Sequence, residues 1–547
     1  MDDPRFPKLS NQQVNTLKSY GEVEFYEEPT IIMDFGDKQY DFFLVLQGGI
    51  KIMNHDEEKS EITVHGVHEF SGASSILSNR TADVQGETLE NTKLLRVKPD
   101  DIKKAISKYS DISDLLLNAF LLRADIMRND DGGVKLIGSG KSTETYEMRD
   151  FMDKNDIRYD FIDSDEDSRL MELLQDFHLQ KSDLPVLIND KNQVAKRPTL
   201  NEIAECSGVR VKMKDKLYDV LVIGAGPAGL AASVYASSEG LSVLTIDCTA
   251  PGGQAGKSSK IENYLGFPTG ISGKDLANKG YIQAQKFGCT ISVPHNVEKI
   301  EHHDNHYVVY ASDTEPIKAK TVIAATGASY RRLPIDNIDK FEGCGIYYSA
   351  TSMHASMCKN SEIGVVGGGN SAGQAALFLC NYAKKVYVII RSDDIGAKMS
   401  DYLVQRLEAA ENIEVLTNAN VIAVDGDTFL DTVKIKQGEE MIDNNIMYLF
   451  TFVGAKPCVE WLNGIIQTDN KGFIKTGANI NLEEGDTGSS GDTYNSSAFE
   501  TSLPGLFAVG DVRSGSVKRV ASAVGEGSIV VSDIHKFLAS QVQNSAH

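Results

Sequence analysis

A glycine-rich turn between a predicted strand and a predicted helix constrains the fold of this chain most strongly. Residues 218–247 read YDVLVIGAGPAGLAASVYASSEGLSVLTID, the pattern of a buried strand, a turn, a helix and a second strand. The turn has the form Gly-x-Gly-x-x-Gly, in which glycine allows a tight turn, close approach of backbone to a pyrophosphate, and packing of helix on strand. Asp247 follows the last glycine by 18 residues, close to the spacing of an acid that binds a ribose hydroxyl. The segment predicts a Rossmann unit with a dinucleotide on the helix N-terminus. The turn residues expected at the cofactor are Gly224, Gly226, Pro227, Ala228 and Gly229.

A second unit of this kind occupies residues 361–391, SEIGVVGGGNSAGQAALFLCNYAKKVYVIIR. Its turn has the tolerated Gly-x-Gly-x-x-Ala form, and its second strand ends in Arg391, 19 residues after the alanine, rather than in an acid. The arginine favours NADPH over NADH, because a planar guanidinium pairs with a 2′-phosphate where an acid repels it. No basic cluster follows Arg391, so weak or absent nicotinamide binding stays the alternative. The residues expected at this cofactor are Gly367, Gly369, Asn370, Ser371, Ala372 and Arg391.

Length and composition limit what surrounds these two units. At 547 residues the chain exceeds one compact core, so three or more domains are expected. The net charge of −22 disfavours nucleic acid and anionic membrane surfaces as partners. No apolar run is long enough for a membrane span and the start, MDDPRFPKLSNQ, lacks the pattern of a signal peptide, so we expect a cytoplasmic location. The seven scattered cysteines include no C-x-x-C and indicate neither a disulfide scaffold nor a metal site.

The residues after Asp247 narrow the first cofactor to FAD. Residues 248–273, CTAPGGQAGKSSKIENYLGFPTGISG, are similar to the low-molecular-weight thioredoxin reductase family, whose members carry a Gly-Gly-Gln turn and an Asn-Tyr/Trp-x-Gly-Phe stretch beside the flavin ring. The resemblance implies an FAD-binding domain and a homodimer. The matching residues are Gly252, Gly253, Gln254, Asn263, Tyr264, Gly266 and Phe267.

The closing flavin motif of that family is present at residues 501–528, TSLPGLFAVGDVRSGSVKRVASAVGEGS. The resemblance implies that the aspartate of its Gly-Asp pair accepts a hydrogen bond from the ribityl chain. It also implies that the Arg-Val-Ala run starts a helix facing the pyrimidine end of the isoalloxazine, where donors stabilise the negative charge of reduction. The further residues expected at FAD are Val297, Gly327, Gly510, Asp511, Arg519, Val520 and Ala521.

The redox motif of the family is missing. Thioredoxin reductases place C-x-x-C just before the second glycine-rich strand, where one thiolate meets the flavin and the pair then reduces thioredoxin. Ala350 and Met353 stand at those positions. Cys358 has no partner at motif spacing, and we expect a buried structural thiol there. For His354 we expect a hydrogen bond or solvent rather than a place at the flavin.

Residues 1–130 alternate apolar and polar residues in brief runs before a helical close, which predicts a β-barrel. The order resembles a cyclic-nucleotide-binding domain, and residues 70–84, FSGASSILSNRTADV, lie where that family keeps its phosphate cassette. Arg80 and Thr81 match the end of the cassette and form a possible anion site, because a buried phosphate needs a fixed cation and backbone donors. Ala73 replaces the cassette glutamate. We therefore favour a barrel kept as a sensor of another ligand or as a docking module over cyclic-nucleotide binding.

Residues 131–213 alternate predicted strands and helices as β-α-β-α-β-α, which resembles a thioredoxin or glutaredoxin fold. Leu184-Pro185 falls where that fold places its cis-proline. The fold would carry an attacking thiolate at the N-terminus of its first helix, but residues 142–145 read Ser-Thr-Glu-Thr. Without a thiol at that turn this part cannot carry out dithiol exchange, so we expect an adaptor or a docking face.

The sequence thus predicts a multidomain chain with an N-terminal β-barrel, a thioredoxin-like α/β part and two Rossmann-like domains. The polar run at residues 485–497 is expected to form an exposed loop. The expected limits are 1–130 for the barrel, 131–213 for the thioredoxin-like part, 217–333 with 460–547 for the FAD domain, and 334–459 for the NAD(P) domain.

The favoured function is an FAD-dependent, NADPH-linked oxidoreductase that passes electrons to its acceptor without a disulfide relay. No side chain is expected as acid or base, because the cofactor carries the chemistry. The acceptor stays open: a small molecule, oxygen, a quinone, or a ferredoxin-like or thioredoxin-like protein. One alternative is thioredoxin-disulfide reductase activity, by family. The other is a flavin-containing redox or ligand sensor or scaffold.

Overall fold

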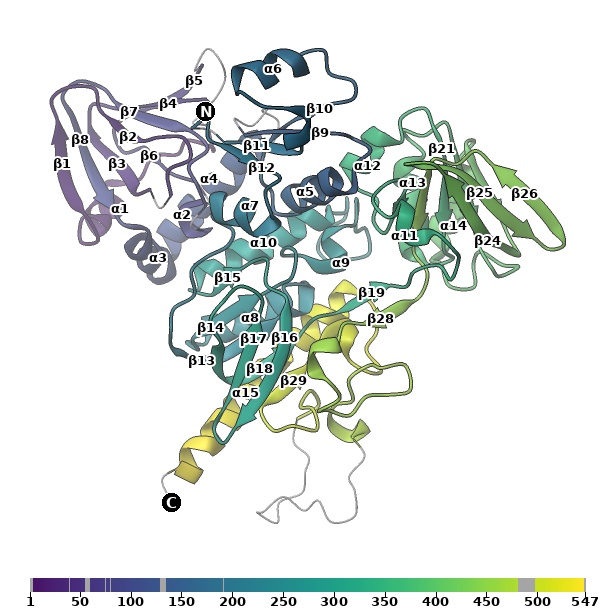
Figure 1. Cartoon of the computed structure of the whole chain (residues 1–547). Helices are drawn as coiled ribbons and strands as arrows, with labels where there is room; N and C mark the ends of the chain where they lie inside the picture. Colours follow the sequence, from purple (N-terminus) through teal and green to yellow (C-terminus); the bar gives the residue numbers. More distant parts are fainter. Residues whose placement is uncertain are drawn as a thin grey trace.

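The computed structural model describes residues 3–38, 40–54, 60–73, 75–78, 80–127, 134–189, 191–480 and 497–545. Figure 1 shows a β-rich part in purple, a small α/β part in blue, a teal unit completed by the yellow C-terminal segment, and a green unit. Of the polar run at residues 485–497, only Ser497 lies within the described residues. No helix in the described ranges combines the length and the apolarity needed to cross a bilayer.

Two four-stranded antiparallel sheets form the N-terminal barrel. One sheet has the order β1 (Glu22–Tyr26), β8 (Thr92–Val97), β3 (Phe42–Gln47), β6 (Phe70–Ser71). The other has the order β2 (Ile31–Met33), β7 (Gln85–Thr88), β4 (Ile50–Met53), β5 (Glu61–His65). The helices are α1 (Asn11–Leu17), α2 (Ser75–Ser78), α3 (Pro99–Lys108) and α4 (Ser110–Met127). The Phe70 ring lies 5.5 Å from Phe42 and 6.2 Å from Phe120 between centroids, so α4 packs on the first sheet.

A small α/β part, here called the α5 module, spans residues 134–210. Its elements are β9 (Lys135–Gly138), α5 (Thr143–Lys154), β10 (Asp160–Asp163), α6 (Leu170–Asp176), β11 (Val186–Ile188), β12 (Val194–Lys196) and α7 (Leu200–Cys206). The strand order is β10-β9-β11-β12, in which β10 runs parallel to β9, and β11 runs antiparallel to both β9 and β12. The sequence predicts the alternation but not β12, because a three-residue strand leaves too short a pattern. The Leu184–Pro185 peptide bond is cis, as the resemblance implies.

The first Rossmann unit is built on a seven-stranded sheet. Its order is β15 (Thr290–Ser292), β14 (Val243–Ile246), β13 (Leu217–Ile223), β18 (Ile317–Ala324), β17 (His306–Ala311), β16 (Val297–His303), with β29 (Leu506–Ala508) beside β18. Its helices are α8 (Pro227–Ser238), α9 (Gly253–Gly256), α10 (Gly273–Lys286) and α15 (Val520–Ser545). Helices α8 and α15 pack closely at Gly527, where a Cβ would lie 2.1 Å from Ala228 O. Strand β13 runs parallel to both neighbours, so its carboxyl end opens at the edge where ligands bind in such sheets.

The second Rossmann unit has a five-stranded parallel sheet. Its order is β20 (Ile346–Tyr347), β27 (Tyr448–Thr451), β21 (Glu362–Val366), β22 (Lys385–Ile389), β23 (Ile413–Leu416). An antiparallel sheet contains β24 (Ala419–Gly426), β25 (Leu430–Gln437) and β26 (Glu440–Asn444). The helices are α11 (Ile338–Phe341), α12 (Ser352–Met357), α13 (Asn370–Leu379) and α14 (Asp401–Ala409). Ile389 and Val433 share one hydrophobic core, so the antiparallel sheet covers a face of the parallel one.

Two short strands connect the Rossmann units. Strands β19 (Ala328–Tyr330) and β28 (Ala455–Pro457) pair antiparallel and form a ribbon between them. Figure 1 shows this connecting ribbon between the teal and green parts, with α5 between the barrel and the second unit. The barrel also contacts the first unit, where Ser107 Oγ donates to Lys286 O at 2.8 Å.

Candidate flavin and nicotinamide site

The first glycine-rich turn joins β13 to α8 and requires glycine for steric reasons. A Cβ on Gly224, whose φ is +105°, would lie 2.3 Å from Ala325 O, and one on Gly229 would lie 1.8 Å from Gly224 O. Gly226 is the N-cap of α8 and supplies no side-chain hydrogen bond to the helix amides. The nearest neighbour of a Cβ there is Gly253 Cα, at 3.9 Å. The first-turn N–H groups of α8 are thus open to a phosphate group.

Asp247 holds the loop that follows β14. Its Oδ2 accepts a hydrogen bond from Ala225 N–H at 2.8 Å. Its Oδ1 accepts from Thr249 N–H at 2.8 Å and from Ala250 N–H at 3.2 Å. Burial raises the pKa of this carboxyl, although the three backbone donors act in the opposite direction. Asp247 therefore ties the glycine-rich turn to the next loop, and Oδ2 keeps a lone pair for the expected ribose hydroxyl.

The Gly-Gly-Gln turn lies against the first turn. Gly252 N–H donates to Ala225 O at 2.8 Å, and Gly252 and Gly253 have φ of +109° and +53°. Gln254 Oε1 is buried and has no hydrogen-bond partner among the described residues. A buried acceptor without a donor marks a place where a ligand group is expected.

The Asn-Tyr-Leu-Gly-Phe loop, residues 263–267, stands at the border of the two Rossmann units. The rings of Tyr264 and Phe267 stack with centroids 5.9 Å apart, and Leu265 is 93% exposed. Glu262, just before the loop, pairs with Arg406 of α14 at 2.6 Å. The loop is thereby anchored to the second unit.

Glu526 of α15 holds the turn after β29. It accepts hydrogen bonds from Gly510 N–H at 2.7 Å and from the Nε and Nη2 of Arg513 at 3.1 and 2.5 Å. Ser516 Oγ donates to the same carboxylate at 3.1 Å. The pair of Glu526 and Arg513 is largely buried, so a change in either partner leaves an unpaired charge. Sequence reasoning did not identify Glu526; its only signal is its place between two glycines of the closing motif.

Asp511 follows Gly510 and is half-buried beside α15. Burial raises the pKa of its carboxyl, and the Lys518 ammonium partly offsets this effect. Helix α15 begins at Val520, so Arg519, Val520 and Ala521 stand at a helix N-terminus, as the resemblance implies. Arg519 is exposed.

The second glycine-rich turn joins β21 to α13. A Cβ on Gly367, whose φ is +143°, would lie 2.9 Å from Phe452 O. Gly369 is an N-cap without a side-chain hydrogen bond, and a Cβ there would meet nothing within 4 Å. The amides of α13 are therefore open, as those of α8 are. Asn370 Oδ1 accepts from Ser400 N–H at 2.8 Å, so this side chain braces the start of α14.

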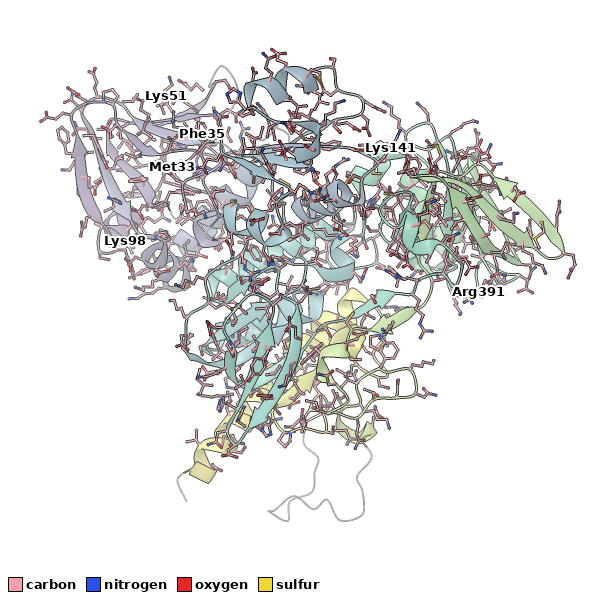
Figure 2. The ribbon with its side chains drawn as sticks, in the orientation of Figure 1. Met33, Phe35, Lys51, Lys98, Lys141 and Arg391 are labelled. Atoms are coloured by element: carbon pink, nitrogen blue, oxygen red, sulfur yellow. The ribbon has the colours of Figure 1, made fainter. Side chains whose placement is uncertain are left out.

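Arg391 lies just beyond β22. Its side chain is exposed and forms no ion pair within the part of the chain that the structure describes. Figure 2 labels Arg391 on the lower side of the second Rossmann unit. Lys398 is exposed as well, while Ser371 is exposed and Ala372 buried at the start of α13. The guanidinium is thus available to a phosphate.

The position of the family's redox pair contains no thiol. Ala350 and Met353 are buried, with exposed fractions of 5% and 7%. Cys358 is fully buried, which confirms the expectation, and burial raises the pKa of its thiol far above the usual range. Cys344 is also buried, and its Sγ donates to Lys141 O at 3.1 Å. All seven cysteines are free thiols.

His354 is fully buried and hydrogen-bonded at both ring nitrogens. Nδ1 accepts from Thr351 N–H at 3.2 Å, so the neutral ring carries its proton on Nε2 and donates it to Tyr146 Oη at 3.2 Å. Burial lowers the pKa of His354 to about 3, with help from Lys154 and Arg149. The hydrogen-bonded histidine that the sequence favours is confirmed, and its partner is a residue of the α5 module.

Residues 218–527, more than half of the chain, match the family model of pyridine nucleotide-disulphide oxidoreductases. The chain belongs to this family. It is a thioredoxin reductase-like oxidoreductase with a further domain at its N-terminus, because residues 23–109 match the model of the cyclic nucleotide-binding domain.

Relatives and solved structures cover the C-terminal part of this oxidoreductase. The thioredoxin reductase of Mycoplasmopsis pulmonis is 34% identical over 317 residues, which is 58% of this chain and 96% of the relative. The 34.2 kDa protein in the rubredoxin operon of Clostridium pasteurianum is 31% identical over 333 residues, 60% of this chain and 99% of the relative. Lactococcus lactis thioredoxin reductase in its FR conformation shares 29% identity and a TM-score of 0.53, covering 59% of this chain and 99% of that one.

Thioredoxin reductase family proteins use FAD and NADPH, and the two turns of this family member fit these groups. Both helix N-termini lack a side-chain cap, and a Cβ would meet only Gly253 Cα, at 3.9 Å, on Gly226 and nothing within 4 Å on Gly369. Gln254 Oε1 is a buried acceptor without a hydrogen-bond partner among the described residues. Arg391 has no competing carboxylate among the described residues. The donor set therefore suits two phosphate-bearing cofactors.

The barrel of this oxidoreductase uses Arg80 at a junction. Its Nη1 donates to Asp156 O of the α5 module at 3.4 Å, and its guanidinium lies 5.6 Å from the ring centroid of Tyr281 in α10. Thr81 is half-buried beside it. Residues 74 and 79 of the predicted cassette lie outside the described residues. The Arg80 guanidinium thus already contacts other parts of the protein. The anion site expected at Arg80 and Thr81 stays a prediction.

A buried cation that sequence reasoning missed lies deeper in the barrel. Arg123 of α4 donates from Nη1 to Gly72 O at 2.6 Å and from Nη2 to Phe70 O at 3.1 Å. Its guanidinium lies 4.5 Å from the Phe70 ring centroid. Burial lowers the pKa of Arg123 to about 10. Its Nε donates to Arg5 O at 2.9 Å, so Arg123 ties the cassette backbone to the N-terminal segment.

Proposed function

We propose that this chain is an FAD-dependent, NADPH-linked oxidoreductase that passes electrons to its acceptor without a disulfide relay. The observation that carries the proposal is the presence of Ala350 and Met353 at the redox position, because neither side chain can exchange disulfides. Cys358, the next thiol along the chain, lies in the hydrophobic core of the second Rossmann unit. With its raised pKa this thiol stays protonated and unreactive near neutral pH. Electrons then leave from the flavin site itself.

The residues of the chain bind and orient the cofactors in this proposal. FAD, when bound, supplies the two-electron chemistry between a nicotinamide and the acceptor. The open amides of α8 and α13 bind phosphate groups, and Arg391 pairs with the 2′-phosphate of NADPH. Gln254 meets the flavin with its unpaired oxygen. The N-terminus of α15, with Arg519, stabilises negative charge at the pyrimidine end of the flavin ring.

We also propose that the α5 module is a thioredoxin-like domain without a C-x-x-C pair and without a thiol at the N-terminus of its first helix. Its strand order, β10-β9-β11-β12, and the position of α5 directly after β9 support this assignment. The N-terminus of α5 approaches Pro185, because a Cβ on Gly138 would lie 2.5 Å from Thr145 Oγ1 and 3.1 Å from Pro185 Cβ. Ser142, Thr145 and Pro185 line a cleft of about 280 Å³ at this place. The cleft lining contains no cysteine, so it offers no thiolate nucleophile.

The residues of the site do not specify the class of the electron acceptor. A small molecule, oxygen, a quinone, a ferredoxin-like protein and a thioredoxin-like protein are all candidates, because a flavin can release electrons singly or in pairs. One relative is named for a rubredoxin operon, and rubredoxin therefore belongs among the acceptors to be tested.

Anaerobic titration of the purified flavoprotein with NADPH and NADH tests the proposal. We expect NADPH to bleach the flavin absorbance at lower concentration than NADH, and replacement of Arg391 by alanine to remove this preference. Reoxidation by each candidate acceptor then ranks the acceptors. A flavin that neither nucleotide reduces would contradict the proposal.

Thioredoxin-disulfide reductase activity is tested with the same protein. We expect no turnover of a bacterial thioredoxin with NADPH, because the chain has no dithiol at the flavin. If turnover is seen and persists after Cys344 and Cys358 are both replaced by alanine, electrons reach thioredoxin by a route other than the one proposed here.

A further inference from the structure

The first turn of α5 packs on the second Rossmann unit beside the redox position. Thr143 Oγ1 donates to Glu342 O at 3.4 Å, and Cys344 Sγ donates to Lys141 O at 3.1 Å. The Thr143 hydroxyl and the Cys344 thiol are themselves 3.1 Å apart. Figure 2 labels Lys141 where the α5 module meets the second unit. The N-terminus of α5 therefore faces a cysteine of another part of the chain.

One turn further along α5, Tyr146 inserts into the aromatic core of the second unit. Its hydroxyl bonds to His354 Nε2 at 3.2 Å, and its ring centroid lies 5.1 Å from that of Tyr347. Gly343 makes room for this contact, because a Cβ there would lie 3.1 Å from Tyr146 Cδ1 and 3.2 Å from Thr143 Cγ2. Burial raises the pKa of Tyr146 well above its usual value, so the hydroxyl stays neutral. The contact is thus a packed and uncharged one.

The far end of α5 contacts the first Rossmann unit. Asn155 Nδ2 donates to Thr249 O at 3.0 Å, in the loop that Asp247 holds. Asp156 pairs with Lys274 of α10 at 2.8 Å. Val293 of the first unit belongs to the same hydrophobic cluster as residues of the α5 module. One helix therefore bridges the two Rossmann units, which the chain itself joins through the connecting ribbon.

We propose that residues 342–354 form an internal docking site that α5 fills permanently. Ala350 and Met353 lie in this segment between the α5 contacts at Cys344 and His354, so α5 stands beside the place where a chain with a redox pair would present its thiols. A free thioredoxin-fold protein is excluded from that surface. Because α5 also contacts the first unit, docking holds the two Rossmann units in one orientation. A rotation about the ribbon would break the contacts at one end of α5.

The chemistry of the contact explains why it is permanent. A cysteine at this helix N-terminus could form a disulfide with Cys344 when an oxidant takes up two electrons and both thiol protons leave, and attack by a third thiol on that disulfide could release it again. Thr143 offers a hydroxyl, which forms no such bond. Packing and neutral hydrogen bonds hold Thr143 and Tyr146 against the second unit, and His354 stays uncharged at neutral pH because its pKa is lowered to about 3. The Tyr146 hydroxyl and the His354 ring, which meet at this contact, are therefore both neutral near pH 7.

A single substitution tests the docking in the full-length flavoprotein. Thr143→Cys places a thiol against Cys344, and mild oxidation should join the two to completion, seen by peptide mapping and by titration of free thiols. The cross-linked protein should reduce its flavin with NADPH at a rate within about twofold of the uncross-linked protein, because a bond across an existing contact shifts no population. It should also remain inert toward added thioredoxin.

Two matched variants control the experiment. Thr143→Ser keeps the hydroxyl and provides no new thiol, and Thr143→Cys with Cys344→Ser has no partner for the new thiol, so neither should cross-link at this site. A cross-link that forms only in trace amounts would overturn the docking, and one that slows flavin reduction more than about tenfold would overturn the fixed orientation. The rate comparison rests on the proposed function. The cross-link yield does not, so the two failures are distinguishable.

Discussion

The side chains around the redox position form a closed and uncharged cluster. His354 lies 4.9 Å from the Tyr347 ring and 5.6 Å from the Phe450 ring between centroids, in edge contacts. Ala350 and Met353, close by in the chain, are also buried. Sequence comparison detects that the thiols are absent, but it does not show what replaces them. The replacement depends on Tyr146, which is more than 200 residues away in the chain.

Because His354 is buried, the free energy of unfolding should fall as the solution becomes more acidic. Its pKa is lowered to about 3 in the folded protein, against 6.5 in the unfolded chain, so its stabilising contribution is complete above pH 6.5 and is lost as pH falls toward 3. Between pH 7 and pH 5 the second Rossmann unit should lose about 2 kcal/mol of unfolding free energy through this residue. Urea unfolding of the chain and of His354→Gln at both pH values measures the difference. Equal losses in the two proteins would contradict the assignment.

At the scale of secondary-structure elements, some features can be predicted from the sequence and others cannot. Both glycine-rich turns and their helix N-termini follow from local patterns, which need no knowledge of distant residues, and the helix starting at Val520 follows from the family resemblance. Strand β12 is too short to leave a pattern. The roles of Glu526, Arg123 and Arg80 depend on contacts between distant segments, so a single sequence carries little signal for them.

Alanine substitutions at two glycines of the first turn should have different effects on folding and on FAD binding. A Cβ on Gly226 fits the protein but takes up room at the N-cap of α8, where we propose that the pyrophosphate binds, so Gly226→Ala should fold normally and lose FAD. A Cβ on Gly229 would lie 1.8 Å from Gly224 O, so Gly229→Ala should lose several kcal/mol of stability, on the order of 3 kcal/mol. Circular dichroism melting and the flavin content of the purified proteins distinguish the two. A flavin-replete Gly226→Ala would contradict the site.

At the scale of the whole molecule, the α5 module contacts the barrel and both Rossmann units. Its Asp156 accepts from Arg80 of the barrel through the backbone oxygen and pairs with Lys274 of the first unit through the carboxylate. Arg158 adds a pair with Asp83 of the barrel at 3.4 Å. The barrel is thus attached to the helix that bridges the two Rossmann units, an arrangement suited to a docking module.

Removal of the Arg80 guanidinium tests this attachment. Arg80→Ala should destabilise the junction of barrel and α5 module by about 1 kcal/mol, through the lost hydrogen bond and the lost contact with Tyr281. Faster proteolysis between the barrel and the α5 module measures the effect, and Lys98→Ala on the exposed edge of the barrel is the matched control (Figure 2).

Cyclic AMP should leave the melting temperature of the native chain unchanged. A rise in that temperature which Arg80→Ala abolishes would identify the barrel as a cyclic-nucleotide receptor instead.

The electron capacity of the protein tests the absence of a disulfide relay most directly. In an anaerobic titration of the FAD-loaded chain with dithionite, a protein whose only redox centre is the flavin takes up about two electrons per FAD. The seven free thiols add none, because none is paired in a disulfide. We therefore predict full bleaching after about two electrons per FAD. An uptake of about four electrons per FAD would reveal a redox-active disulfide and contradict the proposed function.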